Sequence, residues 1–131
     1  MIVLDASAAI ALLLDTQPHA ARLQERLASP GEAFHAPHLI DLEVAQTLRR
    51  YVLRGDFYPE RAAIALDDLT ALGIQHHSHS MFLPRIWHLR DNMTAYDAMY
   101  VALAEALDAP LVTLDRRLHA AAGTHATIEL F

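Results

Sequence analysis

Two aspartates of the sequence each come directly after a short apolar run that favours a β-strand. Asp5 follows residues 2–4, and Asp115 follows residues 111–114. In open parallel sheets, functional sites form at the carboxyl ends of the strands, near the point where the strand order reverses. Either aspartate alone is explained more simply as the N-cap of the helix that follows it. Together, at equivalent ends of two strands, they indicate a candidate acidic site.

Two further acids also have structural alternatives. Thr94-Ala95-Tyr96-Asp97 matches a capping box in its aspartate variant, and on physical grounds alone this role is favoured for Asp97. The first turn of a helix can nevertheless aim a carboxylate into the crevice of a sheet. Glu43 lies in the middle of a predicted helix, where periodicity alone does not distinguish it from Asp41.

Strands and helices are predicted to alternate along the chain. We expect strands at residues 2–4, 33–36, 74–77, 111–114 and 127–131, and helices at 7–14, 16–28, 37–54, 59–73, 81–90, 94–109 and 116–122. Pro37 is expected to begin the third helix and Gly55 to end it. This alternation predicts an α/β fold, a three-layer α/β/α sandwich around a mostly parallel sheet, in a single domain over residues 1–131.

Composition narrows the classes of function. The chain has 131 residues, 53% of them apolar, which is typical of one globular domain. It has no cysteine, which excludes disulfides and thiolate metal sites. No secretory signal or membrane span is evident, so we expect a soluble, cytoplasmic protein. The net charge of −6 argues against a simple cationic nucleic-acid binder, and all ten basic side chains are arginine.

Four segments together resemble the PIN-domain family. Ile2-Val3-Leu4-Asp5-Ala6-Ser7 resembles its opening strand, and residues 37–50 resemble the helix that carries its second acid, here Glu43. The segment 92–104, with Asp97, is similar almost position for position to the one carrying the third acid. Residues 111–118, with Asp115, resemble the strand carrying the fourth. The order, spacing and small size resemble the VapC-type toxins of bacterial toxin–antitoxin pairs over nearly the whole chain.

This resemblance implies a metal-dependent endoribonuclease that hydrolyses RNA to leave a 5′-phosphate and a 3′-hydroxyl. Four carboxylates without cysteine favour Mg²⁺ or Mn²⁺, because these hard cations prefer oxygen ligands. Asp5 and Asp97 are expected to bind the metal most directly. Glu43 is expected to hold and orient metal-bound water, and Asp115 to complete the site or a second metal position. The expected partners are RNA, a cognate antitoxin that blocks the site, and a second copy in a homodimer.

Residues near the four acids have supporting roles in this hypothesis. Ser7, Thr113 and Asn92 are candidates to hydrogen-bond the acids, and Asn92 could instead contact substrate. For these three, capping or turn roles explain the sequence equally well. Arginines near the acids are candidates to contact RNA phosphates, although solvated helix faces are an equal alternative for them: Arg49, Arg50, Arg116 and Arg117.

Other interpretations fit the sequence less well. His76, His77 and His79 suggest a metal site, but their spacing is irregular and an exposed loop is favoured. The helical stripe of Tyr96, Tyr100, Leu103 and Leu107 is interpreted as core or dimer interface. A phosphoacceptor receiver domain is disfavoured, because the chain has no lysine and no adjacent acid pair after its first strand. A PIN-domain nuclease of RNA processing or decay, or a catalytically silent PIN-like binding module, remains an alternative function.

Overall fold

The computed structural model describes all residues from 1 to 131 and contains one sheet of five parallel strands. The strands are β1 (Ile2–Leu4), β2 (Phe34–Pro37), β3 (Gln75–His77), β4 (Leu111–Thr113) and β5 (Ile128–Leu130), in the spatial order β3-β2-β1-β4-β5. The predicted sandwich with a parallel sheet is therefore confirmed.

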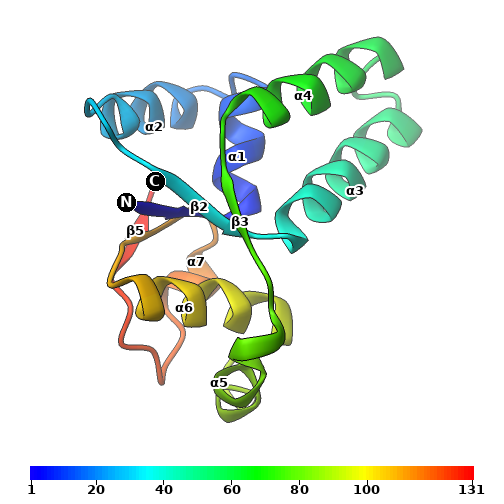
Figure 1. Cartoon of the computed structure of the whole chain (residues 1–131). Helices are drawn as coiled ribbons and strands as arrows, with labels where there is room; N and C mark the ends of the chain where they lie inside the picture. The colour runs from blue at the N-terminus through cyan, green and yellow to red at the C-terminus, as the bar shows by residue number, and fades with distance from the viewer.

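Seven α-helices flank this sheet (Figure 1). They are α1 (Ala6–Leu13), α2 (His19–Leu27), α3 (Leu39–Arg54), α4 (Pro59–Ala71), α5 (Leu83–His88), α6 (Ala95–Leu107) and α7 (Arg116–His119), with a short 3₁₀ turn, η1 (Ser80–Phe82), before α5. In Figure 1, α1 to α4 lie above the strands, while α5 and α6 lie below them. None of the helices combines the length and apolar character needed to span a bilayer.

The strand order reverses between β1 and β4. The chain leaves β1 outward through β2 to β3, then returns to place β4 on the other side of β1, with Val3 opposite Leu111 and Leu4 opposite Val112. Such a reversal opens a crevice at the carboxyl ends of the two central strands. Asp5 and Asp115, which follow β1 and β4, therefore stand at neighbouring positions on the same edge of the sheet.

The core is built on β1 and α6. All three residues of β1 are buried, and α6 is buried continuously from Ala98 to Ala104. This helix packs against β1, β2 and β4 on one side and against α5 on another, so it needs apolar residues around most of its circumference. A helix fixed in this way holds the side chains of its first turn in a defined position.

Several predicted boundaries were wrong by a few residues. Pro37 does not begin a helix but is the last residue of β2, where Pro37 lies opposite His77 of β3, and α3 begins at Leu39. The second helix begins at His19 rather than residue 16, with Pro18 at its N-cap. Gly55 ends α3 as predicted, with the positive φ of 80° that glycine adopts without a steric penalty.

The loop expected for the histidines was wrong, while the aromatic stripe is divided between the core and the surface. His76 and His77 do not lie in an exposed loop but in β3, where His76 contacts Asp41 and the Nε2 atom of His77 lies 2.9 Å from Nδ1 of the buried His35. In the predicted stripe on α6, Tyr100 and Leu103 are core residues. Tyr96, by contrast, is 63% exposed, so it does not belong to the core.

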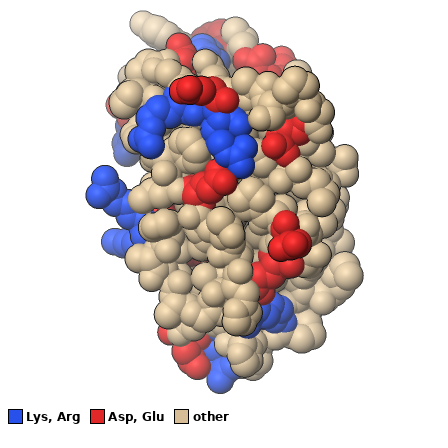
Figure 2. All heavy atoms as spheres, turned by 90° about the vertical axis from the view of Figure 1, so that its left-hand side faces the viewer, with Lys and Arg blue, Asp and Glu red and all other residues tan.

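Ion pairs tie the two ends of the chain to the sheet. Arg26 of α2 forms a two-pronged pair with Glu129 of β5 and lies near Glu32, which also binds the N-terminal amine. Figure 2 views the molecule from the side where both termini lie in Figure 1, and there arginine and acidic atoms lie side by side. That face therefore shows mixed charge rather than a continuous cationic surface.

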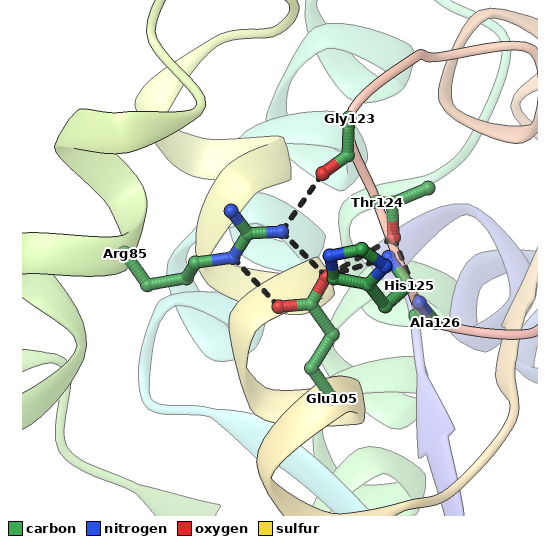
Figure 3. A network of polar contacts seen from close by, with 6 residues as sticks. All are labelled: Arg85, Glu105, Gly123, Thr124, His125 and Ala126. Carbon is green, nitrogen blue, oxygen red and sulfur yellow. Dashed lines mark hydrogen bonds and ion pairs between the residues drawn. The ribbon is translucent and has the colours of Figure 1, made fainter.

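A second network fastens the segment after α7 to two helices (Figure 3). Arg85 of α5 donates to both carboxylate oxygens of Glu105 on α6, at 2.7 and 2.8 Å, and to the carbonyl of Gly123 at 2.8 Å. The backbone N–H of His125 also donates to Glu105, at 2.8 Å. Gly123 has a φ of +82°, and a β-carbon there would lie 2.3 Å from the amide nitrogen of Asn92. The positive φ therefore favours glycine, and any larger residue would also displace the end of the Asn92 side chain.

Replacing Glu105 with glutamine should lower the free energy of unfolding at pH 7 by about 1–3 kcal/mol, because Arg85 loses its charged acceptor. The Arg85 hydrogen bond holds the pKa of Glu105 below its ordinary value of 4.5, against burial. The stabilisation is therefore present above pH 4.5 and is lost as the pH falls through the lower folded-state pKa. Denaturant titrations from pH 7 downward should show that the difference in free energy of unfolding between Glu105→Gln and wild type becomes smaller.

The matched control is Asp56→Asn, which breaks the exposed pair between Arg54 and Asp56. Those side chains are 62% and 51% exposed, against 26% and 15% for Arg85 and Glu105. The exposed pair should contribute less than about 0.5 kcal/mol. Equal losses for both variants, or a Glu105→Gln loss that does not change with pH, would contradict this account.

Candidate active site

A pocket of about 790 Å³ opens at the carboxyl ends of β1 and β4, between the beginnings of α1, α3 and α6. All four acids singled out in the sequence line it. They come from four separate elements: Asp5 after β1, Glu43 on α3, Asp97 on α6 and Asp115 after β4. The other lining residues include Ser7, Thr16, Leu39, Leu42, Gln46, Thr47, Arg50, Tyr51 and Tyr96.

Asp5 is fixed by hydroxyl groups from both central strands. Its Oδ2 atom accepts hydrogen bonds from the Ser7 hydroxyl and, at 2.8 Å, from the buried Thr113 hydroxyl. The backbone N–H of Ser7 also donates to Oδ2, at 3.3 Å, which makes Asp5 the N-cap of α1. Ser7 and Thr113 in turn accept the backbone N–H groups of Leu114 and Asp115, each at 2.9 Å.

Asp115 is the N-cap of α7. Its Oδ1 atom accepts from the backbone N–H groups of Arg117 at 2.7 Å and Leu118 at 3.4 Å. The capping and site interpretations of Asp5 and Asp115 are therefore compatible, because each cap uses a single carboxylate oxygen. The second oxygen of each residue has no hydrogen-bond partner within the protein.

Asp97 lies in the first turn of α6, but only half of the predicted capping box forms. The Thr94 hydroxyl accepts the backbone N–H of Asp97 at 3.1 Å, and the carboxylate of Asp97 makes no return bond to Thr94. The Thr94 side chain lies near enough to the carboxylate to lower the pKa of Asp97, but neither oxygen is held by a short hydrogen bond, and the side chain lines the pocket. Thr94 alone caps the helix that delivers this carboxylate.

Glu43 is held by a hydrogen bond from a buried residue of α6. The hydroxyl of Tyr100, on α6, donates to its Oε2 atom at 2.7 Å and leaves Oε1 without a protein partner. Asp41, which periodicity did not distinguish from Glu43, instead contacts His76 at 3.0 Å outside the pocket. Tyr100 is a site residue that the sequence analysis missed, although its position three residues after Asp97 places both on the same face of α6.

The acids of the pocket disfavour one another's charge. Burial raises the pKa of Glu43, and the charges of Asp5 and Asp97 raise it further, against the hydrogen bond from Tyr100. Burial also raises the pKa of Asp97, with further contributions from Asp5 and Asp115. A cation in the pocket would relieve this repulsion, because an opposite charge favours the ionised form.

The free oxygens suit a hard divalent cation. Asp5, Glu43 and Asp115 each offer one carboxylate oxygen without a protein partner, and Asp97 offers two. No three acidic or histidine side chains lie close enough together to enclose a metal ion by themselves. This spacing fits Mg²⁺, which keeps several of its waters, so that one or two of the carboxylates could bind it directly and the others through those waters.

The remaining predicted site residues are distributed unevenly. Arg50 lines the pocket and contacts Thr47 at 3.1 Å, but Arg49, Arg116 and Arg117 do not line it. Asn92 lies against Gly123, away from the pocket, so its placement does not support a role beside the acids. The separation of Arg50 from Arg49 follows from helical geometry, since adjacent residues point about 100° apart.

Comparisons with known proteins agree on one family. Residues 2–124 match the family model described as PIN domain. The chain is 50% identical over 100 residues to ribonuclease VapC1 of Mycobacterium tuberculosis, covering 73% of both chains. It is 40% identical over 130 residues to ribonuclease VapC12 of the same species, covering 99% of this chain and 98% of the relative.

Two solved structures share the fold. VapC20 of Mycobacterium tuberculosis, described as a Sarcin-Ricin loop cleaving toxin, superposes with a TM-score of 0.67 at 15% identity, covering 95% of this chain and 96% of that one. VapBC2 from Rickettsia felis, bound to a DNA fragment from its promoter, gives a TM-score of 0.70 at 13% identity, covering 100% and 99%. At such identities these likenesses establish the fold alone.

Asp97→Asn should stabilise the metal-free protein at neutral pH. Because the folded state raises the pKa of Asp97, ionised Asp97 opposes folding, and stability falls as the pH rises from about 3.8 through the folded-state pKa. The neutral asparagine removes this penalty. Thermal unfolding in EDTA should give a higher midpoint for the variant at pH 7, by roughly 3–5 °C for each kcal/mol regained.

The gain should disappear below the ordinary pKa of aspartate, where both states of the wild type are protonated. Asp67→Asn, on the exposed face of α4, is the control and should change the midpoint little at either pH. A gain of equal size at pH 3 and pH 7 would contradict the electrostatic explanation.

Proposed function

Because the chain belongs to the PIN-domain family and is a VapC-type ribonuclease, the toxin of a toxin–antitoxin pair, we propose that Asp5, Glu43, Asp97 and Asp115 form its hydrolytic site. The observation that carries this proposal is the pocket at the switch point of the sheet. There four elements distant in sequence each contribute a carboxylate with at least one oxygen free of protein partners.

PIN-domain ribonucleases are typically metal-dependent, and Mg²⁺ or Mn²⁺ is the cofactor proposed here. Asp5 and Asp97 would hold it most directly, with Asp115 completing the site. When bound, the cation supplies positive charge to the scissile phosphate and increases the acidity of water beside it. The hydroxyls of Ser7 and Thr113 hold Asp5 on one oxygen and so fix the direction of the other.

Glu43 is proposed to orient the attacking water and accept its proton. Burial raises its pKa above the ordinary value, which makes the carboxylate a better proton acceptor than an exposed one. The water oxygen forms a bond to phosphorus, the bond from phosphorus to the 3′ oxygen breaks, and that oxygen takes a proton from solvent. The products are a 5′-phosphate and a 3′-hydroxyl, as the family resemblance implies.

A partner that covers the pocket would inhibit this site. Toxins of the VapC type pair with a VapB antitoxin, and the Rickettsia felis structure is such a VapBC pair. We propose that the antitoxin of this chain covers the pocket mouth, where the exposed Leu42 and Tyr96 provide apolar contact area beside the acids. A homodimer remains a proposal on the family resemblance.

The first experiment is RNA cleavage by the purified, antitoxin-free protein. We expect discrete fragments of total cellular RNA in Mg²⁺ or Mn²⁺, with mapped 5′-phosphate ends, and none in EDTA. Asp5→Asn and Asp97→Asn should abolish cleavage, and Glu43→Gln should slow it by about 10²–10⁴-fold. Asp41→Asn is the matched control on the same helix, outside the pocket, and should cleave like wild type.

If wild type leaves RNA intact in every metal condition while it binds Mn²⁺, the carboxylates are not a general nuclease centre. The silent PIN-like binding module would then be the better description. If Asp41→Asn and Glu43→Gln lost cleavage activity equally, the cause would be a disturbed helix α3 rather than a change in the pocket.

RNA binding should depend on Arg50 more than on its neighbour Arg49, because only Arg50 lines the pocket. Using the Asp97→Asn protein to prevent cleavage, Arg50→Ala should weaken binding of a single-stranded RNA. It should also reduce the slope of log affinity against log salt by about 0.7, the value for one phosphate contact on a single strand. Arg49→Ala should leave the RNA affinity and its salt dependence nearly unchanged. Equal effects of Arg50→Ala and Arg49→Ala would argue for a diffuse cationic surface.

A further inference from the structure

Tyr100 is a buried tyrosine with a single polar partner among the side chains, and that partner is Glu43. It is 1% exposed and lies among the largest fully buried side chains of the core. Its hydroxyl donates to Oε2 of Glu43 at 2.7 Å, from α6 across to α3, over 57 positions of sequence. A buried tyrosine hydroxyl needs such a partner, but a core position could have been filled by phenylalanine without creating that need.

The chemistry of the pair makes the direction of the bond unambiguous. Burial, together with the negative charge of Glu43, raises the pKa of Tyr100 far above its ordinary value, so the phenol keeps its proton. The same hydrogen bond lowers the pKa of Glu43, against the stronger effect of burial. Tyr100 is therefore the donor of this hydrogen bond and Oε2 of Glu43 the acceptor.

The hydrogen bond from Tyr100 restricts the orientation of the Glu43 side chain. A glutamate side chain has several rotatable bonds, and an unpaired carboxylate beside a large open pocket would sample many of its rotamers. With Oε2 engaged by Tyr100, Oε1 is left as the oxygen without a protein partner. A group that orients water must itself be held within a fraction of an ångström, and a partner behind it provides that restraint.

Helix α6 fixes the positions of the Asp97 and Glu43 carboxylates relative to one another. Asp97 and Tyr100 both belong to α6 and are three residues apart, so they lie on one face of it. Asp97 places its own carboxylate in the pocket, while Tyr100 holds that of Glu43 from α3. Because α6 is buried along most of its length, this spacing is as rigid as the core itself.

We propose that Tyr100 is a positioning residue that holds Glu43 in the orientation required to direct the attacking water onto the phosphate. This inference rests on the proposed nuclease function. It assigns Tyr100 no contact with RNA or metal, and it predicts that the tyrosine hydroxyl acts only through Glu43.

The test is a double-mutant cycle of Tyr100→Phe and Glu43→Gln in the full-length protein, with a defined RNA that wild type cleaves. Tyr100→Phe should lower kcat by about 10–100-fold, as loss of a supporting hydrogen bond typically does, while KM and the Mn²⁺ dissociation constant change by less than about threefold. In the Glu43→Gln background the same change should have no further effect on kcat, because the group it positions has already lost its function.

Tyr58→Phe is the matched control, since Tyr58 is exposed at the start of α4 and its hydroxyl makes no hydrogen bond within the protein. Thermal midpoints of all variants are measured alongside, so that loss of fold is separated from loss of position. Should Tyr100→Phe fail to fold, Glu43→Asp provides a second test. Its shorter side chain withdraws from Tyr100 with its charge intact, and it should reduce kcat while Mn²⁺ affinity is kept.

The outcomes separate this inference from the function on which it rests. RNA left intact by wild type would remove the proposed function itself. If wild type cleaves and Glu43→Gln does not, three results would overturn the role of Tyr100: a kcat for Tyr100→Phe within twofold of wild type, an additional loss in the Glu43→Gln background, or a loss confined to KM. Glu43→Asp with wild-type kcat would overturn it as well.

Discussion

One carboxylate oxygen joins the beginning of this chain to its end. Oδ2 of Asp5 accepts hydroxyl groups from Ser7 and from Thr113, which lies 108 positions away in sequence. Those hydroxyls in turn receive the backbone N–H groups that follow β4. The junction of β1 and β4 is thus closed by side chains as well as by the ladder between the strands. Because this is the point where strand order reverses, the pocket exists only when the junction is formed.

In three of the four pocket acids, one carboxylate oxygen stabilises the fold and the other is free. In Asp5, Asp115 and Glu43, one oxygen is used by the fold, in two helix caps and a bond to tyrosine, and the other is left free. Asp97 is the exception, because Thr94 caps its helix instead. The fold interactions orient the acids but do not cancel their charge. Repulsion therefore remains in the metal-free protein, and function is maintained here at some cost in stability.

The acids could be predicted because the sequence marks them locally. Asp5 and Asp115 follow apolar strands, and the capping threonine before Asp97 identifies the start of a helix. The choice of Glu43 over Asp41 needed the family resemblance, because both lie on one helix and periodicity does not say which face meets the sheet edge. The structure shows the difference between them: Glu43 lines the pocket and accepts a hydrogen bond from Tyr100, while Asp41 contacts His76 of β3.

Other features depend on contacts that no local pattern encodes. Pro37 favours a helix start in isolation, yet it ends β2, where pairing with β3 decides the matter. Tyr100 and Tyr96 belong to one apolar stripe by spacing, but the edge of the pocket passes between them, so one is buried and the other exposed. Asn92 stands close to Asp97 in sequence and is nevertheless directed to Gly123, because the segment after α7 packs there.

The parallel pairing of β1 with β4 joins two segments that the ribosome synthesises at different times. Val3 is synthesised 108 positions before its neighbour Leu111. On the ribosome, β1 and α1 emerge long before β4, so the growing polypeptide carries Asp5 and Ser7 without the hydroxyl of Thr113 until β4 follows. A toxin built in this order has no assembled pocket until β4 has left the exit tunnel and paired with β1. The ribosome that makes it is therefore not exposed to its activity while the segments from β1 to α6 are being synthesised.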